Sequence, residues 1–122
     1  MYSLVYVSRA VTALNDVELE LLLGTSRASN ASEGLTGLLL HVVGYGPDGE
    51  GAFVQLLEGG QAAVQSTFDR ILVDELHHGI TVVTEGPAPT RRFASWAMRL
   101  EEISAQDFSG PDDAERLLAK FG

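Results

Sequence analysis

Residues 34–60 read Gly-Leu-Thr-Gly-Leu-Leu-Leu-His-Val-Val-Gly-Tyr-Gly-Pro-Asp-Gly-Glu-Gly-Ala-Phe-Val-Gln-Leu-Leu-Glu-Gly-Gly, and this stretch decides the fold. It holds two apolar runs, at 34–43 and 52–57, and the residues between them include four glycines and one proline. Short apolar runs bounded by turn-forming residues are typical of strands, and a glycine-rich connection is typical of a hairpin loop. We therefore expect a β-hairpin in the middle of the chain.

A strand and a helix precede this hairpin. Residues 2–8 are rich in β-branched and aromatic side chains, and their alternation puts Tyr6 on one face of a strand. Asn15 is placed as a helix N-cap, with Glu18 three residues later in the capping-box position. The helix should end within residues 27–31. Its apolar stripe consists of Leu19, Leu22 and Leu23.

A second helix, two strands and a short terminal helix are expected after the hairpin. Apolar residues at helical spacing predict the second helix: Val64, Phe68, Ile71 and Leu72. Strands are expected at about 80–84 and 93–100, with Gly86, Pro87 and Pro89 breaking the chain between them. Pro111 at a first helical position predicts the terminal helix, with Leu117 and Leu118 on its apolar side.

The resulting order, βαββαββ plus a C-terminal helix, predicts an α+β, ferredoxin-like sandwich. Both crossover helices should lie on one face of a mixed sheet. The first and third strands are expected as central, parallel neighbours. The opposite face is left for the terminal segment or a second subunit. We expect residues 1–103 to form the main domain and residues 104–122 an extension.

Composition excludes several function classes. A chain of 122 residues with 45% hydrophobic and 20% charged residues suits one globular domain. The absence of cysteine excludes disulfides, thiolate metal sites and any light sensor that bonds a flavin to a thiol. The net charge of −9 argues against nucleic-acid and anionic-membrane binding. No apolar run is long enough to span a bilayer, and the N-terminal residues lack signal-peptide features, so we expect a cytoplasmic protein.

Two polar residues are expected to meet inside the sandwich. If the first and third strands pair, Tyr6 and Gln55 lie next to each other on the face covered by the helices. A buried polar group without a partner costs about 1–3 kcal/mol, so the simplest interpretation is that this phenol and amide satisfy each other.

Other candidate residues also have ordinary structural interpretations when each is taken alone. Asn30 would be a turn or cap residue at the end of the first helix. Trp96 and Met98, on one face of the last predicted strand, would be core residues. His77 and His78 would form a surface helix end rather than a metal site, and no metal is expected. His41 would be a structural histidine with its hydrogen bonds satisfied.

The joint pattern resembles the BLUF family, the blue-light sensors that use a flavin. Six segments occur in the family's order between Tyr6 and Met98. They are 4–8 (Leu-Val-Tyr-Val-Ser), 25–30 (Thr-Ser-Arg-Ala-Ser-Asn), 34–39 (Gly-Leu-Thr-Gly-Leu-Leu), 53–59 (Phe-Val-Gln-Leu-Leu-Glu-Gly), 68–71 (Phe-Asp-Arg-Ile) and 92–98 (Arg-Phe-Ala-Ser-Trp-Ala-Met). The resemblance implies the ferredoxin-like fold, with FAD held non-covalently between the two helices and FMN or riboflavin as alternatives.

The resemblance also implies roles for individual residues. Tyr6 would give an electron and a proton to the excited flavin. Gln55 would bridge that tyrosine to the N5 and C4 carbonyl edge of the ring, and Asn30 would bind the polar ring edge. Trp96 and Met98 would lie near the glutamine. The cofactor would also be approached by Arg70, Asp74 and His77.

Rearranged hydrogen bonds at Gln55 would then signal through the last strand. On this hypothesis the protein is a photoreceptor and not an enzyme. It would act through a homodimer or larger oligomer and a separate downstream protein.

The sequence departs from the family at several positions. Leu76 stands where the family usually has arginine, which removes one candidate donor to the ring or phosphates. Ser29 replaces a frequent second asparagine, Ala97 occupies a variable position, and the loop at 44–51 is longer than the usual tight turn.

Two other functions compete with the photoreceptor. The first is a flavin-free ferredoxin-like binding or scaffold module, which the departure at Leu76 favours. The second is a small hydrolase of the acylphosphatase type. That chemistry needs a glycine-rich phosphate loop after the first strand, and only Arg9 is present there.

Overall fold

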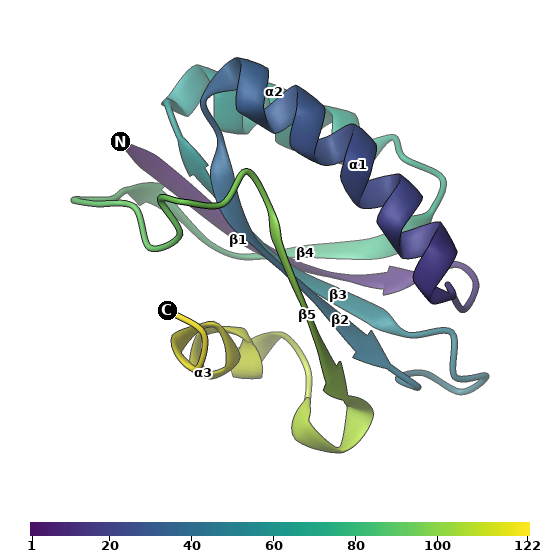
Figure 1. The fold of residues 1–122 in the computed structure, drawn as a ribbon. Coiled ribbons are helices and arrows are strands. Elements are labelled where there is room, and N and C mark those ends of the chain that lie inside the picture. The colour runs from purple at the N-terminus through teal and green to yellow at the C-terminus, as the bar shows by residue number, and fades with distance from the viewer.

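The computed structural model describes residues 1–122 as a five-stranded sheet with helices on both faces (Figure 1). The strands are β1 (Tyr2–Ala10), β2 (Thr36–Val43), β3 (Ala52–Gly59), β4 (His77–Pro87) and β5 (Arg99–Ser104). The helices are α1 (Asp16–Glu33), α2 (Gln61–Leu72) and α3 (Ala114–Ala119), with 3-10 turns at Ala105–Asp107 and Pro111–Asp113. The predicted element order and the α+β, ferredoxin-like fold class are confirmed.

The strand order is β4-β1-β3-β2-β5, so β1 and β3 are central neighbours as expected. Their pairing is antiparallel, however, and the prediction of a parallel pair was wrong. Each helical crossover returns the chain to the same direction, whereas the β2–β3 hairpin reverses it once. β1 and β3 lie on opposite sides of that reversal and must run in opposite directions. Only β2 and β5 pair in parallel, which makes the sheet mixed.

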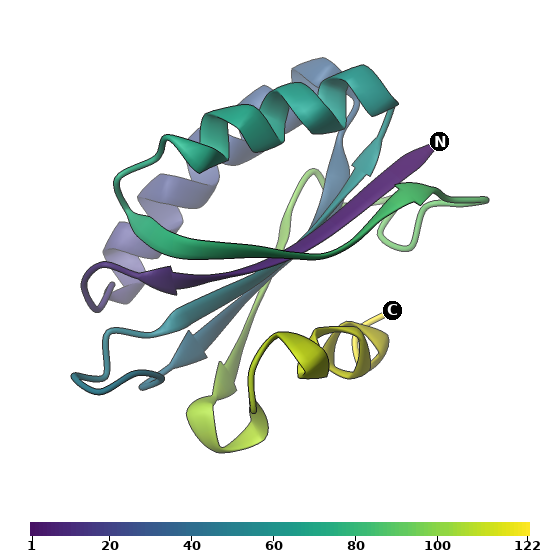
Figure 2. The same ribbon diagram turned by 180° about the vertical axis from the view of Figure 1, so that it is seen from behind.

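The two crossover helices cover one face of the sheet, and the C-terminal segment covers the other (Figure 2). Beneath α1 and α2 lies a core that includes Leu4, Leu19, Leu57 and Val64. The opposite core joins the sheet to the C-terminal segment through Phe108, Ala114, Leu117 and Leu118. The C-terminal segment thus packs against the second face of the sheet. None of the helices has the length and hydrophobicity needed to span a lipid bilayer.

Helix α1 begins as the sequence predicts and ends slightly later. The Asn15 side chain accepts from the backbone N–H of Glu18 at 2.8 Å, and the Glu18 carboxylate accepts from the N–H of Asn15 at 3.1 Å. This reciprocal capping box fixes the first turn. The helix continues through Glu33 and stops at Gly34, whose φ of 70° is the left-handed conformation that glycine adopts without strain.

The last strand differs from its predicted position. β5 starts at Arg99, and residues 93–96 form a turn in which the N–H of Trp96 donates to the carbonyl of Phe93 at 3.0 Å. Trp96 and Met98 consequently do not share a strand face, contrary to the prediction. The segment is anchored instead by single contacts, such as the N–H of Gly37 donating to the carbonyl of Trp96 at 3.2 Å.

His41 is buried and stacks on Phe53, with ring centroids 5.3 Å apart. Its Nδ1 has no hydrogen-bond partner, so the expectation of a fully satisfied histidine was wrong for this atom. Burial lowers the pKa of His41, because the charged imidazolium would be poorly solvated there.

Two glycine-to-alanine substitutions should have opposite effects on stability. A Cβ at Gly37 would overlap the carbonyl oxygen of Leu56 on the neighbouring strand, whereas a Cβ at Gly24 on α1 would meet nothing within 4 Å. We expect Gly37→Ala to lower the free energy of unfolding by about 1–3 kcal/mol. Gly24→Ala should raise it by about 0.5–1 kcal/mol through helix propensity. Urea unfolding of both variants tests this, and equal effects would contradict the close approach of β2 to β3.

Candidate functional site

A cavity of about 320 Å³ lies between α1, α2 and the sheet. This volume is at the small end of the range for ligand pockets, enough for a planar ring system with its tail outside. The lining residues are Tyr6, Leu22, Thr25, Ser26, Ser29, Asn30, Leu39, Phe53, Gln55, Thr67, Arg70, Ile71, Asp74, Leu76 and His77. The walls are thus partly apolar, with several amide, hydroxyl and charged groups among them.

The cavity wall contains the predicted pair of Tyr6 and Gln55. These residues are direct partners in the β1–β3 register, and both side chains point to the face covered by the helices. The phenol of Tyr6 donates a short hydrogen bond to Oε1 of Gln55. Tyr6 is only 3% exposed and Gln55 only 7% exposed, so the bond is shielded from solvent.

Gln55 is flanked by Met98 and not by Trp96. Nε2 of Gln55 donates to Sδ of Met98 at 3.5 Å, and Met98 is 1% exposed. Trp96 is 47% exposed and lies outside the cavity, with the Arg99 guanidinium 5.7 Å from its ring centroid. A thioether is a weak acceptor, and an amide has two donor hydrogens and two acceptor lone pairs. Gln55 therefore keeps unused hydrogen-bonding capacity at the cavity wall.

Tyr6 is held as a neutral phenol. Burial raises its pKa well above the ordinary value, because the phenolate would lose its hydration, and the negative charge of Asp74 adds to the shift. Its ring lies 5.6 Å from that of Phe68 and 6.0 Å from that of His77. The phenol therefore has an aromatic environment and one strong acceptor.

His77 is fixed by contacts at both ring nitrogens. Nδ1 lies 2.8 Å from the hydroxyl of Ser8, and Nε2 lies 3.1 Å from the carbonyl of Ile71. A carbonyl can only accept, so Nε2 carries a proton. Ser8 is fully buried on β1, and this contact holds the imidazole against the cavity.

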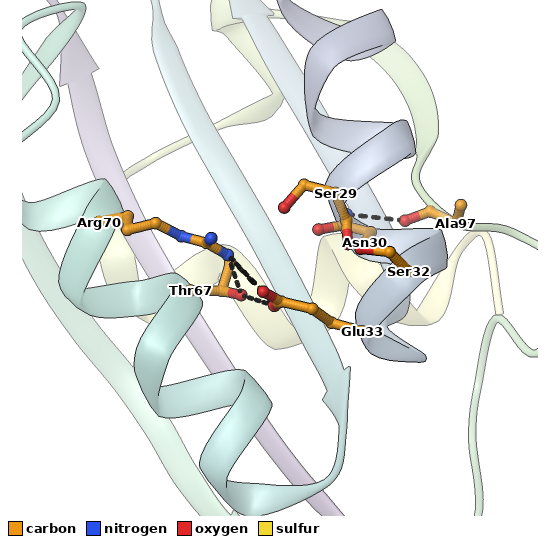
Figure 3. Close-up of polar contacts among 7 residues, drawn as sticks. All are labelled: Ser29, Asn30, Ser32, Glu33, Thr67, Arg70 and Ala97. Atoms are coloured by element: carbon orange, nitrogen blue, oxygen red, sulfur yellow. Dashed lines mark hydrogen bonds and ion pairs between the residues drawn. The ribbon is translucent and has the colours of Figure 1, made fainter.

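Asn30 lies at the cavity on the last turns of α1 and is buried. Its Nδ2 donates to the carbonyl of Ala97 at 2.8 Å (Figure 3). Gly34, rather than Asn30, ends the helix, so the interpretation of Asn30 as a cap residue was wrong. Its amide oxygen has no partner within the protein, and this leaves an acceptor available to a ligand.

A small polar cluster joins α1 to α2 beside the cavity (Figure 3). The guanidinium of Arg70 donates to the Glu33 carboxylate at 3.2 and 3.3 Å and to the hydroxyl of Thr67 at 3.0 Å. The hydroxyl of Thr67 donates in turn to Glu33 at 3.1 Å. We call these three residues the Glu33 cluster. Arg70 and Thr67 line the cavity, and Glu33 is not among the lining residues.

The structure brings together six of the eight predicted site residues, namely Tyr6, Asn30, Gln55, Arg70, Asp74 and His77. Met98 touches the site through Gln55, and Trp96 does not reach it. Sequence reasoning missed several lining residues. Helical spacing could have found Ser26, four residues before Asn30, and Thr67, three residues before Arg70. Phe53 could have been found two residues before Gln55 on the same strand face.

Arg9, the residue that the hydrolase hypothesis needs, is already engaged. It donates to Glu50 at 2.9 Å and lies over the ring of Tyr45, 5.1 Å from its centroid. It does not line the cavity.

The lining residues fit a flavin. Phe53, Leu22 and Ile71 supply apolar walls for a planar ring. The free capacity of Gln55 and the amide oxygen of Asn30 suit the alternating donors and acceptors at a flavin's polar edge. Leu76 lines the cavity at the position where the BLUF family usually has arginine, so it adds an apolar contact and no donor.

Comparisons with known proteins identify the family of the chain. The family model for BLUF, described as sensors of blue-light using FAD, matches residues 1–99. Over 97 residues the chain is 34% identical to photoactivated adenylate cyclase subunit beta of Euglena gracilis, a match that covers 79% of this chain and 10% of that protein. The chain therefore spans about a tenth of the length of such curated relatives.

Solved structures give the same result. BlrB, a BLUF protein in its dark state, superposes with a TM-score of 0.77 at 30% identity, covering 98% of this chain and 93% of that one. A bacterial light-regulated adenylyl cyclase superposes with a TM-score of 0.73 at 28% identity, covering 98% of this chain but 33% of that one. The chain thus belongs to the BLUF family of flavin-binding blue-light sensors.

Proposed function

We propose that the cavity binds FAD non-covalently and that light acts through Tyr6 and Gln55. The observation that carries this proposal is the buried hydrogen bond from the Tyr6 phenol to the Gln55 amide at the cavity wall. Blue light turns a bound flavin into a strong oxidant, which is the chemistry that the cofactor supplies. The remaining steps belong to the protein's own side chains.

Tyr6 is the electron donor in this proposal. Its raised pKa means that the phenol is neutral before illumination. A phenol that gives one electron to the excited flavin becomes a strong acid. Its proton would then move along the existing hydrogen bond to Oε1 of Gln55, and the amide would release one of its own N–H protons in exchange, which leaves it neutral. Burial keeps water from competing for that proton, so electron and proton loss are coupled.

Gln55 converts this event into a change of hydrogen bonding. Its amide oxygen faces Tyr6, and its amide nitrogen has only the weak acceptor Sδ of Met98. Turning or tautomerising the amide exchanges donor and acceptor at the cavity wall, while the weak Met98 contact offers little resistance. The changed contact between Gln55 and Met98 then acts on the backbone directly before β5.

Several expectations accompany this proposal. We propose that residues 1–103 form the sensor and that residues 104–122 form an extension completing the second core. We further propose that signalling uses a homo-oligomer and a separate protein partner, in the cytoplasm. The alternative, a flavin-free binding module, draws support from Leu76, which brings no donor to the cavity.

Tyr6→Phe should retain flavin and lose the photocycle. We expect the wild-type absorption band to shift red after blue light and to relax in the dark. The variant should stay yellow without that shift, since phenylalanine can donate neither electron nor proton. Tyr45→Phe is the matched control, because Tyr45 packs on Phe108 outside the cavity. A normal shift in Tyr6→Phe would refute the donor role, and a colourless wild type with added FAD would favour the flavin-free alternative.

Gln55→Leu should bind flavin without the normal red shift, because leucine cannot exchange donor and acceptor. It also leaves the buried phenol unpaired, which should cost about 1–3 kcal/mol of unfolding free energy. Difference absorption spectra and urea unfolding measure both effects. Gln65→Leu, at an exposed position on α2, is the control. An unchanged light-induced shift in Gln55→Leu would show that another group makes the critical bond.

The neutral state of Tyr6 should also appear in the pH dependence of stability. A tyrosine whose pKa is raised by folding stabilises the native state below its unfolded pKa of about 10, and this contribution is lost as the pH rises further. We expect the apoprotein to lose about 1.4 kcal/mol per pH unit above that value from Tyr6 alone. The unfolding free energies of wild type and Tyr6→Phe should therefore converge between about pH 9 and about pH 11, a range that brackets the unfolded pKa. Parallel pH profiles would contradict the raised pKa.

A further inference from the structure

We propose that Glu33 sets the cofactor selectivity of the site by withholding Arg70 from the flavin phosphate. This inference rests on the proposed flavin site, and it concerns which flavins that site distinguishes. Glu33 does not line the cavity, so its effect is exerted through the Glu33 cluster.

A flavin's phosphate must pass the rim of this cavity. The cavity volume of about 320 Å³ is at the small end of the range for ligand pockets, and a phosphate carries too much charge to be buried without cations. Arg70 is the only arginine or lysine among the lining residues, and its side chain is 54% exposed, which places it at the rim. It is thus the one lining group with a permanent positive charge for a phosphate.

Arg70 is already neutralised. Its Nη2 contacts both oxygens of Glu33 and the hydroxyl of Thr67 (Figure 3). Asp74, two residues after the end of α2, lines the cavity with a second carboxylate. His77 does not compensate, since both of its ring nitrogens are engaged by Ser8 and Ile71. A phosphate at the rim therefore meets one positive charge and two negative charges.

Glu33 is poorly placed for the stability of its own helix. It is the last residue of α1, where the partial negative end of the helix dipole disfavours a carboxylate, and no basic residue occupies that turn. A residue that opposes the local preference and contacts a site residue is better explained by the site than by the helix. Removing its charge should leave the fold intact.

The wild-type protein should hence bind riboflavin, FMN and FAD with similar affinity, within about threefold for riboflavin and FMN. Glu33→Gln keeps the size of the side chain and frees the charge of Arg70. We expect it to tighten FMN and FAD relative to riboflavin by about 3–10-fold, the range for a charge-assisted contact at a partly exposed site.

Isothermal titration of the flavin-stripped full chain with each of the three flavins tests this. Glu20→Gln removes the same charge from the same helix, at a residue that pairs only distantly with Arg27 at 3.9 Å, and should not change the selectivity. The double variant Glu33→Gln, Arg70→Gln should lose the gain. The melting temperature of Glu33→Gln should equal or exceed that of wild type.

Three results would overturn the proposal: an unchanged riboflavin-to-FMN ratio in Glu33→Gln, an equal change in Glu20→Gln, or a wild type that already prefers FMN more than about tenfold. Each of these leaves flavin binding itself intact. If no variant binds riboflavin, FMN or FAD, the proposed function fails, and this inference fails with it.

Discussion

The hydrogen bond between Tyr6 and Gln55 is the constraint on which the site depends, and it is a consequence of strand register. The two residues are opposite each other on β1 and β3, the central pair of the sheet. Side chains alternate across a strand, so a slip of one residue would turn either partner to the face that α3 covers. The register that buries Leu4 and Leu57 under the helices therefore also delivers the phenol to the amide.

The two faces of the sheet differ in structure, since one forms a continuous apolar core and the other contains the proposed sensing site. The face under α3 is a continuous apolar core, with Val5, Val7, Leu38 and Leu40 packed against Leu117 and Leu118. The face under α1 and α2 gives up part of its core to a cavity and polar groups. Stability is thus concentrated on one side, which allows the other side to keep unused hydrogen-bonding capacity at Gln55 and Asn30.

The sequence predicted those parts of the structure that local pattern determines. The capping box at Asn15, the β2–β3 hairpin and the alternation of β1 are all local, and the first strand's alternation placed Tyr6 correctly. Strand direction is a property of the whole path of the chain, and the parallel pairing assigned to β1 and β3 failed for that reason. The prediction of a strand that begins at residue 93 failed because the contacts that hold residues 93–98 are tertiary. Asn30 holds the carbonyl of Ala97 and Arg27 that of Met98, and neither contact has a sequence signal.

The segment 93–98 also offers a route by which a change in the hydrogen bonds of Gln55 would be transmitted beyond the cavity. The backbone before β5 is not part of the sheet ladder, and it is held by side-chain donors at one end and by a buried carboxylate at the other. Glu58, 1% exposed, accepts from the N–H groups of Arg92 and Phe93 at 2.8 Å each. Arg92 reaches Glu115 on α3 at 3.4 Å. Hydrogen bonds of this kind exchange one at a time, whereas a strand ladder shifts only as a whole. On the proposed mechanism, a rotated Gln55 amide alters its contact with Met98, the last residue before β5, so the perturbation enters the chain at a segment that lies outside the sheet ladder.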